Sequence, residues 1–350
     1  MGEISMKVQR KVLLEILNKI RPGVATKDQI EGGTHFIFEG DRIFTFNDQI
    51  SISSPSPINL NCSVPSQELH TLLNKLTDEE IDLELKDGNL KITAQKTKAS
   101  LFVLNETESL KLIRSLDLET LNLWFTLPKD FLDGISLCMF SVSKDTTLGW
   151  MSCVCVSEDM IFSTDDVRIT KFKMCEKIEN AFFLPLSSIK HLINFIPIKY
   201  CLRDGWVHFC GENNTIFSIR MLDLAQPEEN IENFFSIEGV KLFLPENEEF
   251  KRAIDRAGII EDKELEFDRK VYIEIKGENV IIKSQKEGVG WIEEKIVLSS
   301  YDENLDISFR INPSFLKVVM EIMPSLTMVV GENKCLLTSA NFQHILALPI

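Results

Sequence analysis

The feature that most constrains the fold of this chain is a motif that recurs six times along its 350 residues. In each copy a short apolar stretch leads into an amphipathic helix pattern, usually through a proline. Proline is tolerated in the first turn of a helix, where its fixed φ and missing N–H do no harm. The helix entries are Gln9, Pro65, Pro128, Pro185, Pro245 and Pro313, spaced by 56 to 68 residues. Repetition at a near-constant period indicates an architecture of repeated structural units.

An alternating apolar run, broken by a short polar turn, follows each helix pattern. Alternation with a period of two around Asp-Gly or Gly-Glu pairs predicts an antiparallel hairpin. The predicted turns lie at Gly40, Gly88, Asp159, Gly205, Gly277 and Gly331. The separation of helix entry and turn alternates between long (31, 31 and 32 residues) and short (23, 20 and 18 residues). The true repeat is therefore a pair of units.

Three pairs predict an α+β fold with three tandem domains, each with two helices packed on two small antiparallel sheets. We expect the boundaries 1–118, 119–228 and 229–350. The charged stretches 105–122 and 224–239 have weak periodicity and fall where linkers between the domains belong.

Several classes of protein are disfavoured by what the sequence contains. No run approaches 18 apolar residues, and the first ten residues have no apolar signal region, which argues against a membrane span or a secretory signal. The eight cysteines form no Cys-x-x-Cys pair and fall mostly in apolar runs, as reduced thiols of a cytoplasmic protein do.

Signatures of catalysis are also missing from the sequence. There is no phosphate-binding glycine loop, and the five histidines are scattered among different repeats. The adjacent Asp165 and Asp166 are interpreted as turn formers rather than as metal ligands of a nuclease. We expect a non-enzyme with no catalytic residues, no metal and no cofactor.

The sheet edges of such domains suggest how the copies join. Open edges are liabilities, and joining them edge to edge around a circle removes them. With helices about 10 Å apart, six would leave a hole of only ~10 Å, whereas twelve would leave roughly 28 Å. A B-form duplex, about 20 Å wide, fits only the larger hole. Because one chain supplies six helices, a ring around DNA requires two chains.

The distribution of charge agrees with that arrangement. The chain carries a net charge of −15, but its six helix segments together carry +2 and the remainder −17. A helical lining of this kind can contact phosphates without reading bases. The alternative, that these are ordinary solvated helix faces, stays open. The candidate DNA-facing cations of the helices are Arg10, Lys11, Lys19, Arg21, Lys75, Lys190, Lys251, Arg252 and Lys317.

The sequence resembles the bacterial DNA polymerase sliding clamp (β subunit) family over essentially its whole length, as a divergent or phage-type member. The most specific block is 125–172, which contains the landmarks FTLP, FSV, TTLGW and STDDVRI. The resemblance implies a head-to-tail homodimeric ring that encircles duplex DNA as a processivity factor. It also implies a replicative DNA polymerase and a clamp-loader ATPase as partners.

The resemblance further implies a hydrophobic cleft into which partners insert a short peptide. In the family this cleft lies between the second and third domains and the C-terminus. The matching residues here are Leu148, Thr164, Asp166, Val167, Arg168, Ile169, Pro227, Ile231, Leu346, Leu348 and Pro349. Arg168 and Thr164 are expected to fix the orientation of the bound peptide. The alternative, that the C-terminal run is only a closing core strand, stays open.

The chain departs from the family at several positions. The family pattern Thr-Asp-Gly-His-Arg loses its Gly and His, which are replaced by Asp166 and Val167. A DNA-contacting Arg/Tyr pair is replaced by Lys144, a further candidate DNA-facing residue, and Thr147. The resemblance implies a dimer interface at Ala99, Leu101, Ile259 and Ile260, with Ala99 in place of an aromatic residue.

These departures motivate a second hypothesis from a different class. The chain could be a clamp-like interaction module that captures clamp-binding peptides without encircling DNA. A stable species of about twice the chain mass in solution favours the ring, and a monomer favours the module.

Overall fold

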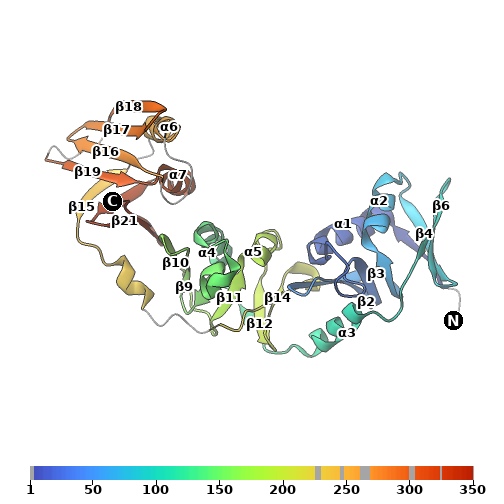
Figure 1. Ribbon diagram of the computed structural model, residues 1–350. Helices are drawn as coiled ribbons and strands as arrows, with labels where there is room; N and C mark the ends of the chain where they lie inside the picture. The colour runs from blue at the N-terminus through green and yellow to red at the C-terminus, as the bar shows by residue number, and fades with distance from the viewer. Residues whose placement is uncertain are drawn as a thin grey trace. The chain divides into compact units, whose positions relative to one another are not determined.

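The computed structural model describes residues 4–224, 230–244, 248–260, 269–298, 304–323 and 325–349. The chain divides into two compact units. Unit 1 comprises Met1–Leu132 and Ile178–Asp223, and unit 2 comprises Asp133–Lys177 and Leu224–Ile350. Figure 1 labels the helices and strands of both units.

Each of the six predicted helix segments contains a helix. These are α1 (Arg10–Ile20), α2 (Ser66–Lys75), α4 (Phe131–Cys138), α5 (Leu186–Leu192), α6 (Glu248–Ala257) and α7 (Pro313–Ile322). Short 3-10 segments are η1 (Arg21–Gly23), η2 (Leu118–Thr120), η3 (Met139–Ser141), η4 (Thr146–Ser152), η5 (Glu212–Asn214) and η6 (Ile231–Phe235).

The predicted linker 105–122 contains a helix that the sequence analysis did not expect, α3 (Glu108–Ser115). The side chain of Thr107 caps its N-terminus by accepting a hydrogen bond from Leu110 N. Leu110 and Ile113 are buried in a cluster that also contains Trp206. One apolar face packed on a sheet is enough to hold two turns of helix, although the sequence around it is charged.

Unit 1 contains two antiparallel sheets. The first has the strand order β1 (Ile4–Gln9), β4 (Glu80–Lys86), β5 (Asn89–Thr93), β6 (Lys98–Phe102). The second has the order β2 (His35–Phe46), β3 (Ile50–Pro65), β14 (Ile216–Arg220), β13 (Trp206–Cys210), β12 (Lys199–Arg203), β7 (Phe125–Thr126). β11 (Phe182–Pro185) leads into α5.

Unit 2 likewise contains two antiparallel sheets. One runs β8 (Cys153–Ser157), β9 (Met160–Thr164), β10 (Arg168–Lys173), β22 (Phe342–Ala347), β21 (Lys334–Ser339), β20 (Leu326–Val330), β15 (Val240–Leu244). The other runs β18 (Gly290–Val297), β17 (Asn279–Lys286), β16 (Val271–Lys276), β19 (Asp306–Ile311).

Two strand pairs connect consecutive predicted copies. β3 pairs with β14, which brings residues 50–53 beside 216–219. β10 pairs with β22, which brings residues 168–172 beside 342–346. Edge-to-edge joining of this kind removes open edges within the chain, as the sequence analysis expected. The boundaries 1–118, 119–228 and 229–350 stay a prediction.

Five of the six predicted turns are confirmed, in the hairpins β4–β5, β8–β9, β12–β13, β16–β17 and β20–β21. In the β4–β5 turn, Asp87 and Gly88 have φ values of 53° and 71°, as a two-residue turn of this type requires.

The turn predicted at Gly40 is wrong, because β2 continues through it as one strand paired with β3. The register shifts between Gly40 and Arg42, and Gly40 has a φ of 60°. A glycine of positive φ serves a bulge as well as it serves a turn, so the sequence signal is the same for both.

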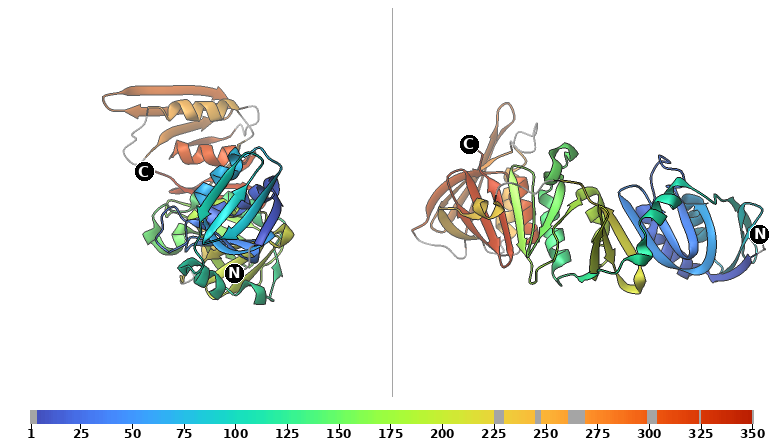
Figure 2. Two further views of the ribbon diagram at one scale, coloured as in Figure 1. Left: turned by 90° about the vertical axis from the view of Figure 1, so that its right-hand side faces the viewer. Right: turned by 90° about the horizontal axis from the view of Figure 1, so that it is seen from below.

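The helices bury the apolar stripes that their periodicity predicts. α1 buries Leu13, Leu17 and Ile20. In unit 2, α6 packs on β17, β18 and α7, so that these helices lie on one face of the β18–β19 sheet (Figure 2). Phe250 of α6 and Phe315 of α7 join the buried strand residues in one core. On the opposite face of that sheet Trp291 is 72% exposed.

Candidate functional site

The turn between β9 and β10 forms the centre of the predicted partner cleft. Thr164 Oγ1 donates to Arg168 O at 2.8 Å, and the Asp165 carboxylate accepts from Arg168 N at 3.1 Å and from Val167 N at 3.3 Å. Asp166, which replaces the glycine of the family pattern, has a φ of 78°. Asp is among the side chains that tolerate this region. The turn therefore keeps a conformation suited to glycine.

Arg168 is largely enclosed beneath this turn. Its Nε donates to Asp165 Oδ2 at 2.7 Å, and its side chain is only 12% exposed. The guanidinium carbon lies 4.1 Å from the ring centroid of Phe315 and 5.6 Å from that of Phe140. With both an ion pair and a stacking partner, Arg168 supports the wall of the site. Its predicted role in orienting a bound peptide stays a prediction.

His344 lies beside this cluster on the neighbouring strand. Its Nδ1 is 2.8 Å from Thr170 Oγ1, and its ring centroid is 5.0 Å from that of Phe140. No hydrogen-bond partner of Nε2 is found among the described residues. Burial, and then the nearby Arg168 charge, hold the pKa of His344 well below its ordinary value. The imidazole is neutral at physiological pH.

The C-terminal strand closes against the turn. In the β10–β22 register Arg168 faces Leu346, and Ala347 N donates to Val167 O at 3.0 Å. Leu346 and Leu348 are buried in the core of unit 2. Ile231 of η6 is also buried. These three predicted cleft residues are therefore buried and do not offer their side chains to solvent.

Only some of the residues predicted for the cleft are accessible to solvent. Leu148 is 44% exposed in η4, which contacts β9. Val167, Ile169 and Pro349 are half-buried, whereas Asp166 is exposed. Leu148, Asp166, Val167, Ile169 and Pro349, four apolar residues and one carboxylate, are the accessible members of the predicted cleft and are called the peptide strip below. Pro227 lies outside the described residues.

One contributor to this region was missed by the sequence analysis. Lys171 of β10 is buried, with its Nζ 2.6 Å from Glu232 Oε2 and 4.4 Å from the ring centroid of Phe235. Lys334 Nζ also donates to Phe234 O at 2.9 Å. These contacts fix η6 on the sheet. The only signal for Lys171 in the sequence was a lysine at a strand position where a buried side chain is expected.

The predicted DNA-facing cations of unit 1 differ in whether their charged groups are bound within the fold or exposed. Arg10 is engaged within the fold, because its guanidinium donates to Asp78 O at 2.8 Å and to Leu73 O at 2.9 Å. On the exposed faces of α1 and α2, His70 Nε2 lies 2.7 Å from Asn18 Oδ1. The predicted DNA-facing cations of this unit that are exposed and make no ion pair within the described residues are Lys11, Lys19, Arg21, Lys75 and Lys190.

In unit 2 two of the predicted cations, Lys251 and Lys317, form ion pairs. Lys317 Nζ lies 2.6 Å from Asp255 Oδ1, and Lys251 Nζ lies 3.3 Å from Glu248 Oε1. Arg252 is exposed and makes no ion pair within the described chain. Lys144 is exposed next to η4.

The predicted dimer residues lie on two elements. Ala99 and Leu101 are half-buried in β6, which ends its sheet. Ile259 follows α6 and is 66% exposed, while Ile260 is half-buried and its carbonyl accepts from Ser284 Oγ. Phe102, which is not among the predicted dimer residues, is 67% exposed at the end of β6. The sequence signal for Phe102 was its position next to Leu101 in the alternating pattern of the strand.

No group of three or more His, Cys, Asp or Glu side chains in the part of the chain that the structure describes could hold a metal ion. No described helix is both long enough and apolar enough to cross a membrane.

No protein-family model and no curated protein matches the sequence. Solved structures match it closely. The DNA polymerase sliding clamp of Bacillus subtilis has a TM-score of 0.82 at 16% identity, and the β sliding clamp of C. crescentus has 0.83 at 16%, each with 100% of both chains covered.

The DNA polymerase III subunit beta of Pseudomonas aeruginosa gives a TM-score of 0.81 at 14% identity, with 99% of both chains covered. Structures this similar over their whole length share one fold even where few residues are identical. The chain therefore has the three-domain α+β fold of the DNA polymerase III β sliding clamps.

Proposed function

We propose that this protein is a non-enzymatic DNA polymerase sliding clamp of the cytoplasm. Two copies would close head to tail around duplex DNA and hold a replicative polymerase on it, after loading by a clamp-loader ATPase. The observation that carries the proposal is the match of the whole chain, rather than of one domain, to sliding clamps. Topological linkage keeps a partner near its template even where the direct contact is weak.

Ring closure is supported by open sheet edges in both units. β6 ends one sheet of unit 1 and β18 ends one sheet of unit 2. Phe102 on the first strand and Val297 on the second are 67% and 57% exposed. Unpaired edges with exposed apolar residues favour pairing with another chain. β6 of one copy is proposed to pair with β18 of the other.

Contact with DNA is supported by the cations of α1, α2 and α5. Lys11, Lys19, Lys75 and Lys190 are exposed and have no carboxylate partner in the described chain. The phosphate backbone attracts such groups irrespective of base sequence. Partner binding is assigned to the strip formed by Leu148, Asp166, Val167, Ile169 and Pro349, where an apolar peptide could dock.

The test is topological and needs no loader. A linear duplex is fixed to a bead at one end and incubated with labelled protein, and its free end is then either blocked or left open. A sliding ring withstands a high-salt wash only on the blocked DNA. Equal loss from both substrates would contradict the proposal.

A second candidate, the interaction module that does not encircle DNA, is favoured by the ion pairs of unit 2. Lys251 and Lys317 are neutralised by Glu248 and Asp255, so α6 and α7 contribute little positive charge. Mass measurement by light scattering separates the candidates. The chain has a mass of 40.0 kDa, and the ring predicts a species of twice that mass.

A further inference from the structure

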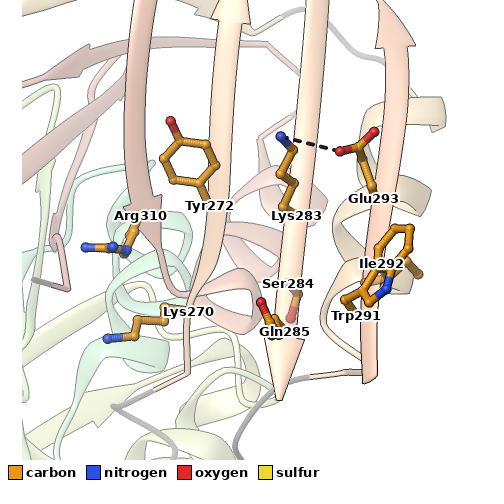
Figure 3. Close-up of a pocket in the computed structure, with 9 residues that line it drawn as sticks. All are labelled: Lys270, Tyr272, Lys283, Ser284, Gln285, Trp291, Ile292, Glu293 and Arg310. Carbon is orange, nitrogen blue, oxygen red and sulfur yellow. Dashed lines mark ion pairs between the residues drawn. The ribbon is translucent and has the colours of Figure 1, made fainter. Parts of the chain in front are cut away.

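The outer face of the β18–β17–β16–β19 sheet carries aromatic and cationic side chains in neighbouring rows. In the first row the strand register places Arg310, Tyr272, Lys283 and Glu293 side by side. In the next row Trp291 pairs with Gln285. Figure 3 shows these side chains on the same face, with Lys270 beside them. They line a depression of about 410 Å³.

This face is accessible because the helices cover the other one. α6 packs against the inward side of β17 and β18, where Val280 and Ile282 are buried. On the outward side, Trp291 is 72% exposed, and Tyr272 is half-buried. A tryptophan that is this exposed on a regular strand contributes nothing to the core. It is available for a ligand.

The electrostatics of the depression favour an anion. Its lining contains three cations, Lys270, Lys283 and Arg310, and one carboxylate, Glu293. That carboxylate is matched by Lys283 at 3.3 Å and by Lys295 at 3.2 Å. Arg310 makes no ion pair within the described residues. The side chains that line the depression thus carry a net charge of +2 (three cations less one carboxylate), on a chain with a net charge of −15.

We propose that this face binds single-stranded nucleic acid. Bases would stack on Tyr272 and Trp291, and phosphates would contact Arg310, Lys270 and Lys283. The two aromatic residues lie two strands and one row apart, about 10 Å across the strands and 7 Å along them. One strand crossing the sheet diagonally can place a base on each ring. Exposed aromatics on a sheet backed by helices are a general platform for stacked bases.

An acidic peptide would satisfy the cations but would leave two aromatic platforms without a partner of matching shape. Stacking on any base fits both rings, since every base has a π-face. The site shares no residue with the proposed peptide strip or with the helix cations proposed to contact DNA. Pairing of β18 with another chain would use backbone groups at the strand edge and leave this face open.

The experiment uses the full chain and a fluorescently labelled oligo-dT of 15 nucleotides as the probe, followed by anisotropy. Tyr272→Ala and Trp291→Ala are each expected to weaken binding about tenfold. Arg310→Gln should weaken it and reduce the salt slope by about one. Phe243→Ala, which removes an exposed aromatic residue from β15, should leave binding unchanged. Thermal unfolding confirms that each variant is folded.

Unchanged affinity in both aromatic variants, or no binding by the wild type at low salt, would overturn the proposal. So would a poly-glutamate peptide that binds as tightly as the oligonucleotide and is equally sensitive to Tyr272→Ala. Retention on end-blocked duplex, measured in the same variants, reports separately on the proposed ring. A variant that loses oligo-dT binding but is still retained on the end-blocked duplex would leave the proposed ring intact. A protein that binds oligo-dT but is not retained on the duplex would contradict the ring and leave this site intact.

Discussion

At the scale of single residues, the chain places charged and polar side chains inside unit 2 next to the predicted cleft. Arg168, Lys171 and His344 are each enclosed, and the first two have a carboxylate partner. A buried charge is tolerated only when it is paired and hydrogen-bonded. These residues therefore hold the β9–β10 turn and η6 in place rather than contacting solvent.

Arg168→Ala should be strongly destabilising, because it leaves the buried Asp165 carboxylate without its ion-pair partner and removes the stack on Phe315. We expect a loss of about 3–5 kcal/mol in the free energy of unfolding, measured with urea. Lys177→Ala breaks an ion pair whose two side chains are 69% and 72% exposed. This control should leave the urea midpoint almost unchanged; an equal loss in both variants would contradict the structural role of Arg168.

His208 should make stability depend on pH. Burial lowers its pKa from 6.5 to about 4, and its Nδ1 lies 2.8 Å from Ser218 Oγ. Between these values the unfolded chain binds the proton more tightly than the folded chain, so stability falls as the pH drops from 6.5 towards 4. The full difference amounts to about 3 kcal/mol.

The measurement is urea unfolding of the wild type and of His208→Gln at several pH values in that range. The variant lacks the titrating group, so its stability should fall less steeply with acid. Parallel curves for the two proteins would show that His208 does not carry the effect.

At the scale of elements, close approach of helix and sheet depends on one small residue. In α4, a Cβ added at Gly134 would lie 2.6 Å from Phe172 Cδ1 and 2.7 Å from Ile161 Cδ1. The glycine lets the helix lie directly on β9 and β10, which carry the predicted cleft. Glycine lowers the helix propensity of α4, but its missing Cβ permits this contact.

Gly134→Ala should therefore destabilise the protein, although alanine raises helix propensity by about 1 kcal/mol. Overpacking of this kind typically costs about 1–3 kcal/mol, visible as a lower Tm. Ser136→Ala, at an exposed position of the same helix, is the matched control and should raise Tm slightly or leave it unchanged. A higher Tm for Gly134→Ala would mean that the strand side chains move aside at no cost.

At the scale of the whole molecule, the proposed function depends on contacts that one chain cannot make with itself. The open edges of β6 and β18 are where a second copy would attach. The dimer would bury Phe102, whose exposure in the single chain costs solvation free energy. The strand edges that are exposed in the single chain are thus the ones that would form the interface of the proposed ring.

Phe102→Asp should convert the dimer into a monomer by placing a charge in the interface. Light scattering should then report the mass of one chain, 40.0 kDa, and the blocked-end duplex should no longer retain the protein. Leu123→Asp introduces the same charge at a position of similar exposure, 69%, and should leave the mass unchanged. A wild-type mass for Phe102→Asp would place the interface elsewhere.

The repeat made much of the fold predictable. Six proline- or Gln9-anchored segments became helices because local signals, namely amphipathic period and helix entry, are written in consecutive residues. The prediction failed at Gly40, where a turn and a bulge need the same positive φ, and it missed α3, whose stability comes from packing on a distant strand. Resemblance supplied the candidate cleft, but not which of its side chains face solvent.

By itself, the sequence determined the six helices, five of the hairpins and the pairing of helix-plus-hairpin segments into an α+β repeat. It could do so because periodicity and turn chemistry act over a few residues. Only the tertiary structure decided that Arg168 is enclosed, that Arg10 is tied to backbone carbonyls, and that Tyr272 and Trp291 share one open sheet face. Those outcomes depend on which distant strands pair and in what register, and a one-residue shift in register would turn each side chain to the other face.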